Sequence, residues 1–144
     1  MFNAIRNTRT LHLGLMFIFG TFFLADPSGA STIYVGNQGS NSLSVIDSVS
    51  KTVIRTIPLS SKKPHNLAAS ADGKYLYIAN VGSHDVVVFD TVANREVVTI
   101  PAGTKTHGVS VTPDGLYLYT ANVGANTVSV ISLVEQKVID TIPV

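Results

Sequence analysis

The sequence predicts an all-β protein built from three copies of one repeat, and two observations support this prediction. A strand-like segment ending in asparagine recurs at residues 34–37, 77–80 and 119–122, with the asparagines 43 and then 42 residues apart. Each copy is followed by further segments rich in Val, Ile and Thr that end at turn-forming residues, as strands do. A strand-based period near 40 residues is typical of a β-propeller, in which each repeat forms one four-stranded blade.

The chain begins with a segment of a different kind. Arg6 and Arg9 give a basic start, residues 11–25 form an apolar run without Lys, Arg, Asp or Glu, and residues 28–30 are small. This order predicts a helical secretion signal peptide over residues 1–30 that is removed by cleavage at its end. The run is shorter than the ~20 residues that cross a bilayer, which argues against a permanent membrane span. We therefore expect an exported protein, periplasmic, extracellular or on the cell surface.

Composition limits the partners of the remaining chain. Residues 31–144 carry eight basic and eight acidic side chains, and Lys62 and Lys63 are their only adjacent basic pair. A chain of zero net charge without a basic cluster has no electrostatic footprint for nucleic acid or an anionic membrane. The sequence contains no cysteine, which excludes disulfides, thiolate metal sites and a thiol nucleophile.

Each complete repeat is expected to hold four short strands that follow one another from the innermost to the outermost. The innermost strand is predicted at 66–70 and 108–112, the second at 32–37, 74–80 and 116–122, the third at 42–47, 85–90 and 127–132, and the fourth at 52–57, 95–100 and 137–142. The blades are therefore predicted at residues 32–58, 66–101 and 108–144.

The side chains of these strands fit blades that stack face to face. Both faces of the second and third strands are apolar, so each strand needs cover on two sides. The fourth strand is more polar and is followed by a proline in every copy, which suits an outer edge. Tyrosines at alternate positions of the second strand are interpreted as packing residues before ligand platforms; they are Tyr75, Tyr77, Tyr117 and Tyr119.

Most of the repeated polar residues are interpreted as structural turn residues. Asparagine tolerates left-handed geometry and bonds its own backbone, and it ends the second strand in every copy. Asp-Gly pairs join the first two strands, since Gly accepts positive φ and Asp bonds nearby backbone. The residues with this interpretation are Asn37, Asn80, Asn122, Asp72, Gly73, Asp114 and Gly115.

Two histidines are the candidates for a ligand site. His65 and His107 lie 42 residues apart, just before the innermost strand, at one mouth of the channel of a closed propeller. One interpretation is a ring of imidazoles for a metal or haem. The other is a repeated loop histidine that bonds a neighbouring backbone, and recurrence in register with the repeat favours it. Two imidazoles without a nearby carboxylate make a poor metal site, so we expect no catalytic residue, metal or cofactor from this pair.

The repeat resembles that of the YVTN family of seven-bladed propellers. The resemblance rests on the Tyr-x-x-Asn strand ends, the Asp-Gly turns, and three Thr-Ile-Pro copies that end at Pro58, Pro101 and Pro143. Ser132 departs from the aspartate found at its position in the other copies, so we expect a weaker cap there. The resemblance implies an exported propeller whose wider relatives include surface-layer-like proteins, lactonases and haem d1 proteins.

The blade count is low for a closed ring. The first copy starts at a second strand, so eleven strands, or about 2.75 blades, are predicted, whereas a propeller closes with about four to eight blades. Apolar blade faces would then lie open at both ends. One hypothesis is that the chain is the N-terminal part of a longer propeller; the alternative is a short protein that closes by self-association.

Two classes of function remain open. The first is a non-catalytic module for binding or scaffolding, favoured because every repeated polar residue has a turn role. The second is part of a propeller enzyme or cofactor carrier, lactonase-like or haem d1-associated, whose active residues would lie mostly outside this chain. The sequence identifies neither a ligand nor a protein partner for either class.

Overall fold

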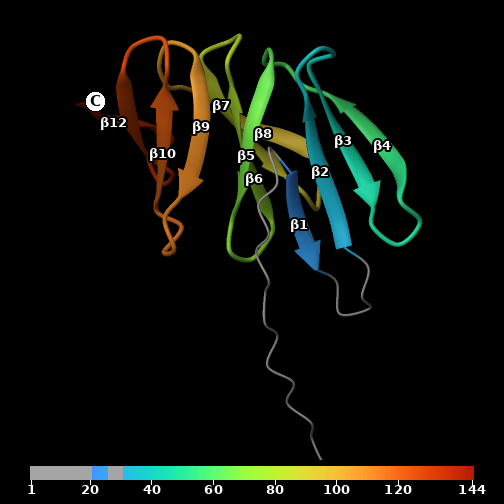
Figure 1. Cartoon of the computed structure of the whole chain (residues 1–144). Helices are drawn as coiled ribbons and strands as arrows, with labels where there is room; N and C mark the ends of the chain where they lie inside the picture. The colour runs from blue at the N-terminus through green and yellow to red at the C-terminus, as the bar shows by residue number, and fades with distance from the viewer. Residues whose placement is uncertain (1–20, 26–30) are drawn as a thin grey trace, which may run out of the picture.

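The computed structural model describes residues 21–25 and 31–144, and every regular element in them is a β-strand (Figure 1). Twelve strands form three antiparallel sheets of four strands each, which confirms the predicted all-β blades. The strands are β1 Thr21–Ala25, β2 Ser31–Asn37, β3 Ser42–Asp47, β4 Thr52–Pro58, β5 Pro64–Ala69, β6 Tyr75–Asn80, β7 Asp85–Asp90, β8 Arg95–Pro101, β9 Thr106–Val111, β10 Tyr117–Asn122, β11 Thr127–Ser132 and β12 Lys137–Pro143.

Each blade is a meander in which strands pair in the order of the sequence. Blade 1 is β1-β2-β3-β4, blade 2 is β5-β6-β7-β8 and blade 3 is β9-β10-β11-β12. The innermost strands β1, β5 and β9 lie side by side, and blades 1 and 3 form opposite ends of the row (Figure 1). Blade 2 is therefore the only described blade with a neighbour on both sides.

Strand β1 completes blade 1, where the sequence analysis expected only three strands. It pairs with β2 over its whole length, from Thr21 opposite Val35 to Ala25 opposite Ser31. The described residues therefore hold twelve strands in three four-stranded blades, not the predicted eleven strands and 2.75 blades, and residues 21–25 are extended. A five-residue apolar run fits a buried strand as well as the end of a leader, and periodicity does not separate the two. The rest of the predicted signal peptide lies outside the described residues.

The innermost strands begin two residues earlier than predicted. The pairing of β5 with β6 shifts between Pro64 and Asn66, and that of β9 with β10 shifts next to Thr106. Such a bulge lets a strand continue through a residue that is out of register. His65 and His107 are those residues, so they lie inside the strands and not before them as predicted.

Two apolar cores hold the three blades together, one on each face of blade 2. Leu76, Ile78, Val87 and Phe89 of blade 2 join the core shared with blade 1, and all four side chains are fully buried. The opposite face joins the core shared with blade 3; its members are Tyr77, Ala79, Val86, Val88 and Ile100. Burial of one large apolar side chain contributes about 1.5–3 kcal/mol, so each core is a major source of stability. Both faces of the second strand are covered as predicted.

Candidate functional site

Asparagines at the end of the second strand tie this strand to the third. Asn80 is fully buried, and its Nδ2 donates to the Asp85 carboxylate at 2.8 Å and to the Ile78 carbonyl at 2.9 Å. Asn122 Nδ2 donates to the Ser129 hydroxyl at 2.8 Å, and Asn37 Nδ2 makes the matching bond to Ser44 at 2.8 Å. The repeated side chain is therefore a clamp between two strands of one blade.

The residues with left-handed backbone geometry in these hairpins are not the strand-ending asparagines. Positive φ occurs four residues later, at Asn41 (51°), His84 (66°) and Asn126 (52°). Asn37, Asn80 and Asn122 themselves do not have positive φ, and their amides form bonds across the hairpin to the third strand. The repeat alignment of His84 with Asn41 and Asn126 was the signal in the sequence for this role.

The clamp of blade 2 is incomplete compared with that of blade 3. Asn122 Oδ1 accepts a bond from the Thr106 hydroxyl at 3.2 Å. Pro64 occupies the corresponding position opposite Asn80 and has no hydroxyl to donate. Asn80 Oδ1 is accordingly buried without a partner among the described residues, which is an energetic cost to blade 2.

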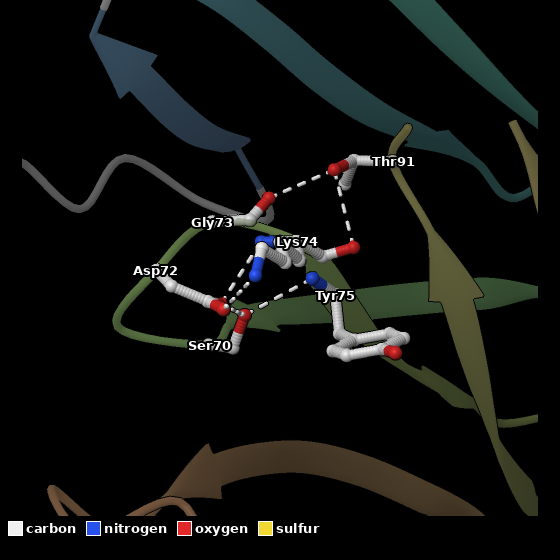
Figure 2. Close-up of polar contacts among 6 residues, drawn as sticks. All are labelled: Ser70, Asp72, Gly73, Lys74, Tyr75 and Thr91. Carbon is white, nitrogen blue, oxygen red and sulfur yellow. Dashed lines mark hydrogen bonds and ion pairs between the residues drawn. The ribbon is translucent and has the colours of Figure 1, made fainter. Parts of the chain in front are cut away.

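The first Asp-Gly turn is held by a network of local hydrogen bonds (Figure 2). Asp72 Oδ1 accepts the Ser70 hydroxyl at 2.7 Å and the Lys74 backbone N–H at 3.1 Å, and the Ser70 hydroxyl oxygen accepts the Tyr75 N–H at 3.0 Å. The bond from Ser70, followed by that from Lys74, lowers the pKa of Asp72 below its usual value. Gly73 has a φ of +71°, as this turn requires.

A neighbouring hairpin closes over this turn. The Thr91 hydroxyl donates to the Gly73 carbonyl at 2.8 Å, which joins the β7–β8 turn to the β5–β6 turn (Figure 2). Blade 3 repeats the bonds around the turn aspartate: Asp114 accepts the Thr112 hydroxyl and the Leu116 N–H. The same bonds, led by that from Thr112, lower the pKa of Asp114. Both aspartates thus act within their turns.

A groove of about 510 Å³ runs between blades 2 and 3 beside these two turns. Tyr77 and Val88 of blade 2 contribute apolar surface to it, and Tyr75 lines it with a partly exposed ring. Asp72 and Asp114 also line the groove. It can admit a small ligand with an apolar body, but its two carboxylates are already engaged by their own turns.

His65 and His107, the two candidates from the sequence, lie next to each other in neighbouring blades. Their ring centroids lie 3.7 Å apart with an interplanar angle of 39°, across the seam between β5 and β9. Burial, and then the charge of His107, lowers the pKa of His65, while a backbone hydrogen bond at His107 opposes the shift. Within residues 21–25 and 31–144, no three His, Asp or Glu side chains form a group that could hold a metal ion. The pair offers two imidazoles to one ligand, or a contact between two blades.

A further histidine, to which the sequence analysis gave no role, bridges the same two blades. His84 Nδ1 accepts the backbone N–H of Lys105 at 3.0 Å. Asn41 makes the equivalent bond one blade earlier, where its Oδ1 accepts the Lys63 N–H at 2.8 Å. The residue at the left-handed position of one blade therefore holds the strand that opens the next blade.

Four-stranded meanders stacked face to face around a row of inner strands define the protein as a β-propeller. Residues 21–144 match the family model described as YNCE-like beta-propeller, and the chain belongs to that family. The start of this match coincides with β1, the strand that completes blade 1. The family model does not name the narrower YVTN repeat, so the YVTN assignment stays a prediction.

The comparison with solved structures gives the same architecture. A chain of hydrazine synthase from Kuenenia stuttgartiensis superposes with a TM-score of 0.73 at 25% sequence identity, over 96% of the present chain. The present chain spans only 39% of the length of that chain. No curated protein matches the sequence. None of the elements in the described part of the chain is a helix of the length and apolarity that crossing a membrane requires.

Proposed function

We propose that this chain supplies blades to an exported propeller that binds or scaffolds other molecules. The observation that carries the proposal is the use of the repeated polar side chains inside the blades. The asparagines clamp strands, the aspartates close turns, and His84 and Asn41 join blades. Side chains with these roles maintain a rigid framework, which favours recognition by shape over catalysis by a convergent set of groups.

The ring is proposed to continue beyond these three blades. Closure of a propeller takes about four to eight blades, and the similar hydrazine synthase chain is more than twice as long as the part that this chain matches. We favour a seven-bladed ring of YVTN type in which these are the N-terminal blades. Sequencing the DNA downstream of codon 144 tests this: further repeats of ~42 residues in any reading frame support it. Their absence would contradict it.

Export rests on the basic and apolar leader, and its test is fractionation. The full chain with a C-terminal tag should be recovered outside the cytoplasm, and Arg6→Glu together with Arg9→Glu should hold it inside. A matched control is Lys62→Glu with Lys63→Glu, which changes charge by the same amount in the folded part. Equal cytoplasmic retention of all three proteins would contradict export.

A second candidate function follows from the neighbouring histidines His65 and His107. An enzyme or cofactor carrier of the haem d1 or lactonase kind could use His65 and His107 at the inner edge of the blades. Addition of haem or Zn²⁺ should then produce a spectral or thermal shift that His65→Ala with His107→Ala abolishes. His84→Asn is the control, because asparagine serves at that position in the other blades. No shift with either probe counts against this function.

A further inference from the structure

We propose that the groove between blades 2 and 3 binds a small organic cation, whose ammonium group meets Asp114 and whose apolar body packs on Tyr75 and Leu133. The inference rests on the proposed binding role and names the class of ligand that one site would take. Three properties of the groove carry it, which are its apolar walls, a carboxylate oxygen left over by a turn, and the sign of its charge.

The walls of the groove are apolar and partly exposed. Tyr75 and Val97 of blade 2 are 38% and 43% exposed, and Val134 of blade 3 is 78% exposed. Apolar side chains that gather in a hollow and stay exposed mark a place where another molecule binds. The volume of about 510 Å³ lies within the range of ~300–1,000 Å³ that small-molecule sites have. The groove therefore suits a small molecule with an apolar body.

The wall on blade 3 departs from the repeat in a way that makes it more apolar. Leu133 occupies the position of Thr91 in blade 2, where the Thr91 hydroxyl donates to the Gly73 carbonyl. Pro113 likewise stands where blade 2 has Ala71, directly before the Asp-Gly pair. Leu133 packs at the margin of the core between the blades, and the rest of its side chain lines the groove. The exchange thus adds apolar surface where blade 2 has a hydrogen bond of its framework.

The carboxylate of Asp114 has one oxygen left for a ligand. Its turn uses Oδ1 alone, which accepts the Thr112 hydroxyl and the Leu116 N–H. Among the described residues, Oδ2 takes part in no hydrogen bond and no ion pair. The bond from Thr112, ahead of that from Leu116, lowers the pKa of Asp114, so this carboxylate is ionised at neutral pH. An ammonium group can therefore pair with Oδ2 without displacing a bond of the turn.

The charge of the groove favours a cation over a neutral or anionic ligand. Asp72 adds a second carboxylate, and no Lys, Arg or His is among the described residues that line the groove. Lys74 pairs with Asp72 at 3.5 Å, but both side chains are more than half exposed, so this pair is weak. The partly exposed ring of Tyr75 also attracts cations through its face. An ammonium group on an apolar body matches all of these features.

An NMR titration of the isotope-labelled full chain with benzyltrimethylammonium tests the proposal. The amide resonances of the turn around Asp114 should shift and saturate as this cation is added. Benzyl alcohol and phenylacetate carry the same ring without a positive charge and should bind at least ~5-fold more weakly. Benzyl alcohol that binds as tightly as the cation overturns the proposal, because the groove would then recognise only the apolar body.

Two matched variants separate the charge of Asp114 from its role in the turn. Asp114→Asn keeps an oxygen that accepts the two turn bonds and removes the charge, so the dissociation constant of benzyltrimethylammonium should rise about 5–10-fold. Asp47→Asn is the control, because Asp47 accepts the N–H groups of Val49 and Ser50 in a turn of blade 1, outside the groove. Equal effects of the two substitutions overturn the proposal.

A second pair of variants tests the aromatic wall, and it also serves if circular dichroism shows that Asp114→Asn has unfolded. Tyr75→Leu keeps apolar bulk and removes the ring face, so the dissociation constant should rise about 2–5-fold. Tyr117→Leu should leave it unchanged, since Tyr117 has the same repeat position, is 36% exposed and does not line the groove. Wild-type chain that does not bind the cation overturns this inference. That outcome would leave the binding role intact, because this role rests on bonds within and between the blades.

Discussion

Blades 2 and 3 have nearly the same sequence pattern and very different surroundings. Blade 2 is covered on both faces, and its second strand is buried at five of six positions. In blade 3 the same strand alternates between buried and exposed residues. The difference shows that a side chain of this repeat becomes part of a core through the neighbouring blade and not through its own blade. Stability should therefore depend on the position of a blade in the row.

The largest expected effect compares two tyrosines at one repeat position. Tyr77→Ala empties a filled site between blades and should lower the free energy of unfolding by about 3–5 kcal/mol. Tyr119→Ala should cost at most about 1 kcal/mol, because Tyr119 is 43% exposed. Urea denaturation measures both. Equal losses of unfolding free energy for the two variants would contradict the difference in burial between Tyr77 and Tyr119.

The next effect exchanges residues at the fourth position of the second strand in blades 2 and 3. Thr120 is fully buried in blade 3 and its hydroxyl has no partner among the described residues, whereas blade 2 has Ile78 there. Thr120→Val should raise the free energy of unfolding by about 1 kcal/mol. Ile78→Thr should lower it by about 2 kcal/mol, since it buries a hydroxyl in an apolar core. Urea denaturation should show changes in the free energy of unfolding of opposite sign for the two variants, and changes of the same sign would contradict the prediction.

A smaller effect concerns the turn after the third strand. Asp90 Oδ1 accepts the N–H groups of Val92 and Ala93, both at 2.8 Å, whereas the Ser132 hydroxyl accepts only that of Glu135, at 3.1 Å. The weaker cap agrees with the expectation from the sequence. Ser132→Asp should therefore raise stability by about 0.5 kcal/mol, seen as a higher melting temperature. Asp90→Ser in blade 2 should lower the melting temperature by a similar amount.

The smallest effect lies at the seam between the blades and depends on pH. The folded protein holds the pKa of His65 below its ordinary value of 6.5, so folding favours the neutral imidazole. This contribution is complete above pH 6.5 and is lost as the pH falls from 6.5 through the lower folded value. His65→Gln should flatten the melting temperature between pH 7 and 5. A wild-type melting temperature that rises over this interval would contradict the assignment.

The repeat predicted most of the architecture because its turns and strands are local features. All three third strands were located correctly from alternating apolar residues and flanking turns, and the Asp-Gly turns form as expected. The bounds of β5 and β9 were missed because bulges carry no periodic signal. Contacts between blades could not be predicted in detail, because they depend on packing between sheets and not on local sequence. The 42-residue spacing places His65 and His107 at the same position of successive blades, but the 3.7 Å between their ring centroids depends on how two sheets pack.

Strand β1, Thr21–Ala25, lies within the predicted signal peptide of residues 1–30, and this overlap has a consequence for maturation. Cleavage at the end of residues 1–30 would remove Thr21–Ala25 together with the export signal. The N–H and C=O groups of β2 that now pair with β1 would then form an unprotected sheet edge, which invites strand addition by another chain. Retention of the strand would instead keep the apolar segment attached to a folded blade. The N-terminal residue of the exported protein therefore decides whether its first blade is a finished structure or an acceptor for a donated strand.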